Sequence, residues 1–240
     1  MASAQRSLEL CRRYGDRPRE GDALSVAGII LLEVGLFDRA AATFAEALEL
    51  LTKTGQRWSR ADCLIYAGLC ETRRGRDGLV MLDEALAEAR RLGARYLEAN
   101  ALVTRAGVHL RMNQVAKAQA DADAGTIVAR AATLTGYEIQ GLARHAVALV
   151  RDPAGNQLAQ AGALVHRALA LLDHQRFLEG SEEEVYANLL EVLVRAGAGD
   201  RAAAVKARGG AEVARKLVAL TDPEWRSAYT SLPECKALLS

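Results

Sequence analysis

Apolar residues recur along this chain at helical spacing, and the pattern then repeats about every 40 residues. Five large side chains occupy equivalent positions, separated by 40, 38, 40 and 44 residues: Leu24, Leu64, Leu102, Leu142 and Tyr186. Eleven positions after these anchors stand Gly35, Gly75, Asn113, Pro153 and Gly197. Because Gly, Asn and Pro favour turns, each period is expected to hold a helix of about four turns, a break and a second helix.

Three segments that begin such periods read almost alike, at residues 15–24, 55–64 and 93–102. Each has a Gly, an Arg two residues later, a ring-bearing residue, and an Asp or Asn two positions before the anchoring Leu. A Gly is expected where a helix ends in a left-handed conformation. We therefore expect one repeat domain over residues 1–240. Its parts are a lone helix at 4–16, hairpins at 20–54, 60–92, 96–132, 137–178 and 182–220, and a C-terminal cap at 222–239.

The small and large residues of the first hairpin resemble the tetratricopeptide repeat position by position: Leu24, Ala27, Gly28, Leu31, Gly35, Ala40, Phe44 and Ala47. The period near 40, where that repeat usually has roughly 34, resembles its long-helix variant. That variant occurs in C-terminal sensor regions of bacterial signalling ATPases and transcriptional activators. The resemblance implies an all-α, right-handed superhelical solenoid of about five hairpins, with an N-terminal half-repeat and a C-terminal capping helix.

Two hairpins depart from the family pattern. In the second, the second helix fits better after a turn two residues shorter, and in the fourth an insertion of about three residues lies at 152–156.

Composition supports helices and excludes some partners. Half of the 240 residues are hydrophobic but only 5% are aromatic, which disfavours a large sheet. The chain has 31 basic and 30 acidic residues, so it lacks the positive charge of a direct nucleic-acid binder. The first ten residues have no apolar signal core, and the most apolar run, 24–37, contains Glu33 and is too short to span a membrane. Four scattered cysteines suit the cytoplasm, where we expect the protein to be.

No set of residues predicts catalysis or metal binding. The four histidines include no pair at ligand spacing with a third ligand nearby. Residues 196–200 lack the Gly-Lys-Ser/Thr ending of a phosphate loop, and no Gly-x-Ser-x-Gly motif occurs. We therefore expect neither an enzyme nor a cofactor.

In the tetratricopeptide family the first helix of each hairpin lines the inner groove, so residues that recur on it are binding candidates. Nine positions after four of the anchors stand Arg73, Arg111, Arg151 and Arg195. A polar edge includes Asp62 and Asn100, and an apolar strip includes Leu69 and Val147. Arginine suits fork-like pairing with carboxylates, so the stripe predicts a grip on an acidic protein segment. Alternatively, the arginines favour helix C-termini and pair with neighbouring acids.

These observations predict an interaction scaffold or sensor module that binds a protein or peptide along its concave groove. The resemblance places it in bacterial signalling or transcription control. The alternative is a sensor in which a small inducer or peptide binds inside the superhelix, which requires polar groups converging on an apolar pocket.

Overall fold

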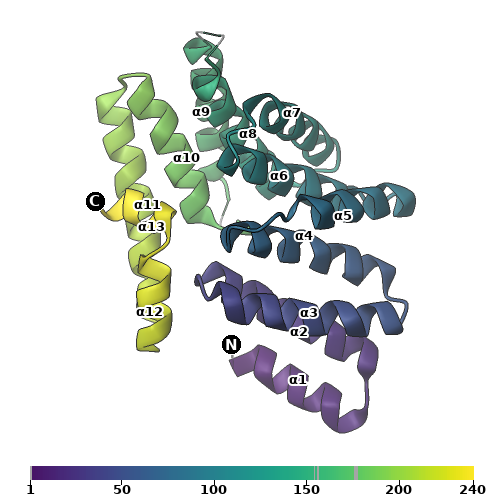
Figure 1. Cartoon of the computed structure of the whole chain (residues 1–240). Coiled ribbons are helices and arrows are strands. Elements are labelled where there is room, and N and C mark those ends of the chain that lie inside the picture. Colours follow the sequence, from purple (N-terminus) through teal and green to yellow (C-terminus); the bar gives the residue numbers. More distant parts are fainter. Residues whose placement is uncertain (1, 154, 156, 176–177) are drawn as a thin grey trace. The chain divides into compact units, whose positions relative to one another are not determined.

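The computed structural model describes residues 2–153, 155, 157–175 and 178–240 (Figure 1). Every regular element within these ranges is a helix, which confirms the all-α class. Residues 154 and 156 of the expected insertion, and residues 176 and 177 of the fourth hairpin, lie outside the described residues.

The helices are α1 (Ala2–Tyr14), α2 (Arg17–Glu33), α3 (Phe37–Lys53), α4 (Arg57–Arg73), α5 (Leu79–Leu92), α6 (Arg95–Arg111), α7 (Val115–Ala131), α8 (Thr135–Arg151), α9 (Leu158–Leu172), α10 (Glu182–Arg195), α11 (Gly199–Ala219), α12 (Pro223–Thr230) and α13 (Pro233–Leu239). The contacts divide the chain into two compact units, Met1–Thr104 and Arg105–Ser240, with the boundary inside α6. We call them the N-terminal and C-terminal units and describe each by itself.

In the N-terminal unit, successive helices pack against one another from α1 to α5, and α2 also contacts α4 (Figure 1). The close approach of α2 and α3 depends on Gly28. A Cβ at this position would lie 2.6 Å from the ring of Phe44, which is itself 1% exposed. A small residue on α2 thus makes room for a large one on α3, as the sequence pattern indicates.

Most of the expected turn positions adopt the left-handed backbone that ends a helix. The φ angles are 85° at Gly35, 78° at Gly75, 56° at Asn113 and 67° at Gly197. Proline cannot adopt a positive φ, and before Pro153 the chain leaves α8 in an extended conformation at Asp152, with a ψ of 114°. The fourth turn therefore has a different backbone conformation from the others, because the proline ring fixes φ at a negative value.

In the C-terminal unit, α8 is the central helix. It contacts α7, α9 and α10, and every residue of α8 from Tyr137 to Leu149 is buried. Helix α10 packs in turn against α9, α11 and α13.

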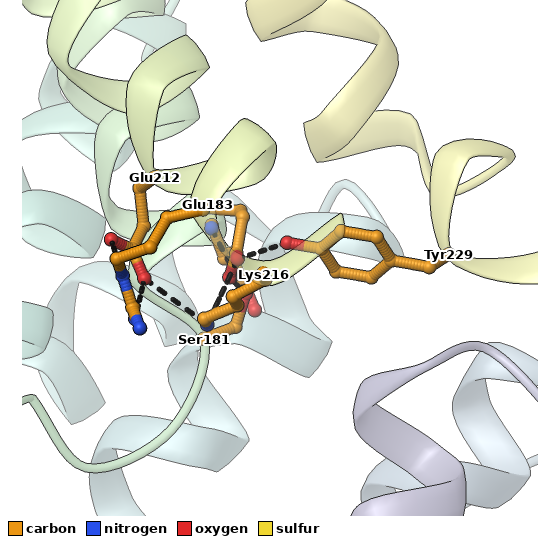
Figure 2. Close-up of polar contacts among 7 residues, drawn as sticks. Ser181, Glu183, Glu212, Lys216 and Tyr229 are labelled. Carbon is orange, nitrogen blue, oxygen red and sulfur yellow. Dashed lines mark hydrogen bonds and ion pairs between the residues drawn. The ribbon is translucent and has the colours of Figure 1, made fainter. Parts of the chain in front are cut away.

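The C-terminal segment forms two short helices. Asp222 caps α12 by accepting hydrogen bonds from the backbone N–H groups of Glu224 and Trp225. Figure 2 shows how α12 is held: buried Glu183 of α10 accepts hydrogen bonds from the Tyr229 hydroxyl and from Lys216 of α11, the latter at 3.0 Å. One carboxylate therefore ties three helices together.

Across the described part of the chain, no helix is both long and apolar enough to cross a membrane.

Candidate functional site

A pocket of about 410 Å³ opens on the C-terminal unit, and we call it the α10 groove. Half of its lining comes from one face of α10, and the rest from the ends of α6 and α8 and from α13. The lining residues are Gly107, Leu110, Arg111, Arg151, Glu184, Ala187, Asn188, Leu190, Glu191, Val194, Arg195, Pro233, Glu234 and Ala237.

The sequence of α10 fixes which residues face the groove. Ser181 is the N-cap, and its hydroxyl accepts a hydrogen bond of 3.1 Å from the backbone N–H of Glu184. With 3.6 residues per turn, Glu184, Asn188, Glu191 and Arg195 fall on one stripe of the helix. Polar groups thus alternate with Ala187, Leu190 and Val194 along the groove.

The first charged group in the groove, which we call the Glu191 cluster, joins Glu191 to Arg151 and Arg195. Arg151 donates Nε and Nη2 to the two Glu191 oxygens at 2.8 and 2.5 Å, and Nη2 of Arg195 lies 3.2 Å from Oε1. The hydrogen bonds to Glu191 raise the pKa of Arg151 above its usual value. Both guanidinium groups are also anchored to backbone carbonyls, Arg151 to Leu110 at 3.3 Å and Arg195 to Val150 at 3.2 Å. Each guanidinium group is therefore held by both a carboxylate and a backbone carbonyl, although the cluster borders solvent.

The second charged group, the Glu184 cluster, has the same composition. Oε1 of Glu184 lies 3.4 Å from Nη2 of Arg144 and 3.6 Å from Nη2 of Arg111. Arg144 is buried, with a side chain 7% exposed, and it donates to Oε1 of Gln140 at 3.1 Å. Gly107 makes room for it, because a Cβ there would lie 2.9 Å from Arg144 Nε.

Four apolar residues form what we call the floor of the groove: Leu110, Ala187, Leu190 and Val194. Ala187 and Leu190 lie between Glu184 and Glu191 along α10, whereas Val194 lies beyond Glu191 and is 62% exposed. A third carboxylate, Glu234 of α13, lines the same pocket and is largely buried. Ionic groups around a partly exposed apolar floor are suited to holding a segment of polypeptide chain.

Three of the four predicted arginines, Arg111, Arg151 and Arg195, line this one groove. The fourth, Arg73, belongs to the N-terminal unit, where its guanidinium lies 5.9 Å from the centre of the Phe37 ring. All three groove arginines lie beside carboxylates of the same unit, as the alternative interpretation of the stripe anticipates.

The polar edge and the apolar strip are less accessible than expected. Asp62 and Leu69 are half-buried on α4. Asn100 is 2% exposed; its amide donates to the Tyr66 hydroxyl at 3.4 Å and its oxygen accepts from Thr104 at 3.1 Å. Val147 is fully buried, because α8 is enclosed by α7, α9 and α10, so it is a core residue and offers no surface to a partner.

Sequence reasoning missed Arg144, the buried partner of Glu184, and the three groove residues of α13. Arg144 stands two positions after the anchor Leu142, a position that the repeat pattern did not single out. Pro233, Glu234 and Ala237 belong to α13, outside the repeat, so no periodicity points to them.

In the described ranges, no group of three or more His, Cys, Asp or Glu side chains is arranged to hold a metal ion. No protein-family model matches the chain, and a search of the curated proteins found no match.

Proposed function

We propose that the chain is a tetratricopeptide-like interaction module whose α10 groove binds a segment of a partner protein. The observation that carries this proposal is the groove itself, a partly exposed apolar floor beside two clusters of paired charges. A peptide segment needs such a surface, because its side chains gain from apolar contact while its polar groups need partners at the rim.

The proposal includes a right-handed superhelical stack of about five hairpins, the architecture that the repeat pattern implies. Within each unit, the first helices of neighbouring hairpins touch, α2 with α4 and α8 with α10. This is the packing expected when successive hairpins shield one another. On the same reading, the module binds and does not catalyse, and it serves bacterial signalling or transcription control.

We place the protein in the cytoplasm. The four cysteines are free and buried, and burial raises the pKa of Cys63 and of Cys70 to about 12. Thiols of this kind are unreactive core groups, which suits a reducing compartment.

The proposal is tested by selecting peptides from a displayed random library on the wild-type protein and measuring their affinity for two variants. Ala187→Trp places an indole in the groove and should weaken the selected peptides about tenfold or more, since it displaces them from the floor. Ala203→Trp, on the exposed side of α11, is the matched control and should leave affinity unchanged. Equal affinity for all three proteins, with unaltered thermal unfolding, would show that the peptides do not bind in the α10 groove.

A second candidate function is supported by the volume of the pocket. About 410 Å³ lies within the range of small-molecule sites, so a metabolite or inducer would also fit. A thermal-shift screen against a metabolite panel separates the two functions. A compound that stabilises the wild type but not Ala187→Trp favours the small-ligand sensor, whereas selected peptides that do so favour the protein-interaction module.

A further inference from the structure

Two aromatic side chains of the N-terminal unit stack on each other where α4 and α6 begin. Trp58 is the second residue of α4 and Tyr96 the second residue of α6; their ring centroids are 5.9 Å apart and their planes differ by 26°. Tyr96 covers one face of the indole, but Trp58 is still 48% exposed. The stack therefore leaves a flat apolar surface open to solvent.

Four arginines beside the stack share two glutamates that lie beneath them. Hydrogen bonds or ion pairs join Arg57 and Arg91 to Glu88 of α5, and Arg90 and Arg95 to Glu98 of α6. The side chains of the two glutamates are 5% and 12% exposed, whereas those of the four arginines are 56–68% exposed. Solvent therefore meets the guanidinium groups more than the carboxylates. We call the surface made by the two rings and these arginines the aromatic edge: Trp58, Tyr96, Arg57, Arg90, Arg91 and Arg95.

The aromatic edge carries an excess of positive charge. Four arginines against two glutamates leave a formal charge of +2. The neighbouring ion pairs, Arg60 with Glu84 and Lys53 with Glu49, each add one charge of either sign and leave the excess unchanged. The whole chain has 31 basic and 30 acidic residues, so this excess is local.

The helix dipoles divide the four arginines into two kinds. Arg90 and Arg91 lie in the last turn of α5, where the dipole favours a positive charge. Arg57 and Arg95 are the first residues of α4 and α6, where the dipole disfavours one. Each buried glutamate therefore has one arginine in a favourable place already, and a half-exposed ion pair contributes little to stability. The arginines at the two helix starts thus indicate a role beyond the fold.

These two arginines keep donors for a ligand. Among the described residues, Arg57 contacts Glu88 through Nε alone, at 2.7 Å, and Arg95 contacts Glu98 through Nη1 alone, at 2.9 Å. Because arginine has five N–H donors, the remaining N–H groups of each side chain can bind an anion. Each of the two directly precedes a ring of the stack in the sequence.

A flat ring flanked by arginines fits a strand of nucleic acid. Bases stack on exposed aromatic rings, and guanidinium groups pair with phosphates in a fork-like geometry. A duplex keeps the faces of its bases stacked inside, and an acidic peptide supplies charge without a base. We infer that the aromatic edge binds single-stranded nucleic acid, with a base stacked on Trp58 and the flanking phosphates held by Arg57 and Arg95.

Fluorescence anisotropy on the full chain tests this inference. Labelled oligo-dT and oligo-rU strands of about twelve nucleotides are compared with a duplex and with a polyglutamate peptide of equal charge, at about 50 mM salt. At least one strand is expected to bind about tenfold tighter than the duplex and the peptide. Its affinity should fall with salt, with a logarithmic slope of about 0.7 for each phosphate contact.

Variants of the protein separate stacking from charge. Trp58→Ala should weaken the strand about tenfold, whereas Trp58→Phe keeps a flat ring and should stay within about threefold of the wild type. Arg95→Gln should weaken binding and lower the salt slope, and it leaves Glu98 its second arginine, Arg90. Arg201→Gln, at an exposed arginine of α11, is the matched control and should change nothing.

Tryptophan emission reports the stacking directly. The chain has two tryptophans, so Trp225→Phe leaves Trp58 as the reporter and Trp58→Phe leaves Trp225. The strand should quench the emission of the first variant and leave that of the second unchanged.

Several results would overturn the inference: no binding at low salt, a duplex or polyglutamate peptide that binds as tightly as either strand, equal affinity of Trp58→Ala and the wild type, or unquenched Trp58. Tighter binding of the peptide would instead assign the edge to an acidic protein. None of these results bears on the α10 groove, which is tested with selected peptides and Ala187→Trp, so the two sites stand or fall separately.

Discussion

At the scale of single residues, one helix end carries a side chain that is unfavourable for its backbone conformation. Thr133, between α7 and α8, has a φ of 58°, a left-handed conformation that is unfavourable for a β-branched side chain. The equivalent positions after α1 and α3 are Gly15 and Gly55, with φ of 68° and 69°. The backbone at these positions is left-handed, and threonine adopts this conformation at a higher energetic cost than glycine does.

Thr133→Gly is expected to stabilise the protein by about 0.5–1 kcal/mol. The left-handed conformation costs a non-glycine residue about 1–2 kcal/mol, and part of that gain is lost to the greater freedom of glycine in the unfolded chain. Chemical denaturation measures the difference. Thr133→Ala is the control, because it keeps the Cβ and should change stability by less than about 0.5 kcal/mol. A glycine variant less stable than the alanine variant would contradict the reasoning.

The candidate site shows which features of a binding surface a residue pattern can predict and which it cannot. The common offset from the anchors singled out Arg111, Arg151 and Arg195, and these three side chains line one groove, whereas Arg73 at the same offset does not. The same reasoning assigned Val147 to a surface, but its burial depends on how α8 is enclosed by α7, α9 and α10. Periodicity therefore indicates a face, while exposure depends on neighbours that one sequence position cannot reveal.

At the scale of helices, glycines on buried faces set the distances between elements. Gly209 of α11 lies against α13 and α10, and a Cβ there would be 2.6 Å from Leu238 and 2.8 Å from Tyr186. Gly162 of α9 has no such neighbours, since nothing lies within 4 Å of the position of its Cβ. These two glycines form a matched pair within the C-terminal unit.

Gly209→Ala should destabilise the protein by about 1–3 kcal/mol, because the methyl group overpacks the contact that seats α13, despite the better helix propensity of alanine. Gly162→Ala should stabilise it by about 1 kcal/mol from propensity alone. Thermal unfolding followed by circular dichroism compares the two. Shifts of the same sign would mean that α13 is not closely packed against α11.

The helices themselves could largely be predicted from the sequence. The turn residues Gly35, Gly75, Asn113 and Gly197 mark real helix ends, since a left-handed residue stops a helix wherever it occurs. The placement of α13 beside α10 could not be predicted, because the cap lies outside the repeat and its contacts are long-range.

At the scale of the whole molecule, stability should depend on pH through one acidic group near the cap. Burial, together with the neighbouring Glu212, raises the pKa of Glu182 to about 7. Because this exceeds its usual value of 4.5, the folded protein retains a proton that the unfolded chain releases. The resulting stabilisation is complete below about pH 4.5 and is lost as the pH rises through about 7.

Glu182→Gln removes this titration. Between pH 5 and pH 8, the wild type should lose about 1–2 kcal/mol of unfolding free energy relative to the variant, after allowance for solvent screening. His109 and His145, whose pKa values are lowered by burial, act on both proteins alike and cancel in the comparison. Denaturation curves recorded across this range provide the measurement, and parallel pH profiles would show that Glu182 is ionised in the folded state.

The claim on which the function depends is that the α10 groove is the binding surface. Methyl-resolved NMR of the wild-type protein, with and without the tightest selected peptide, tests it most directly. We predict that the methyl signals of Leu110, Leu190 and Val194 shift on binding, while those of Val218, exposed on α11 outside the groove, stay in place. Unchanged groove methyls, with the shifts gathered at Val218 or elsewhere, would contradict it.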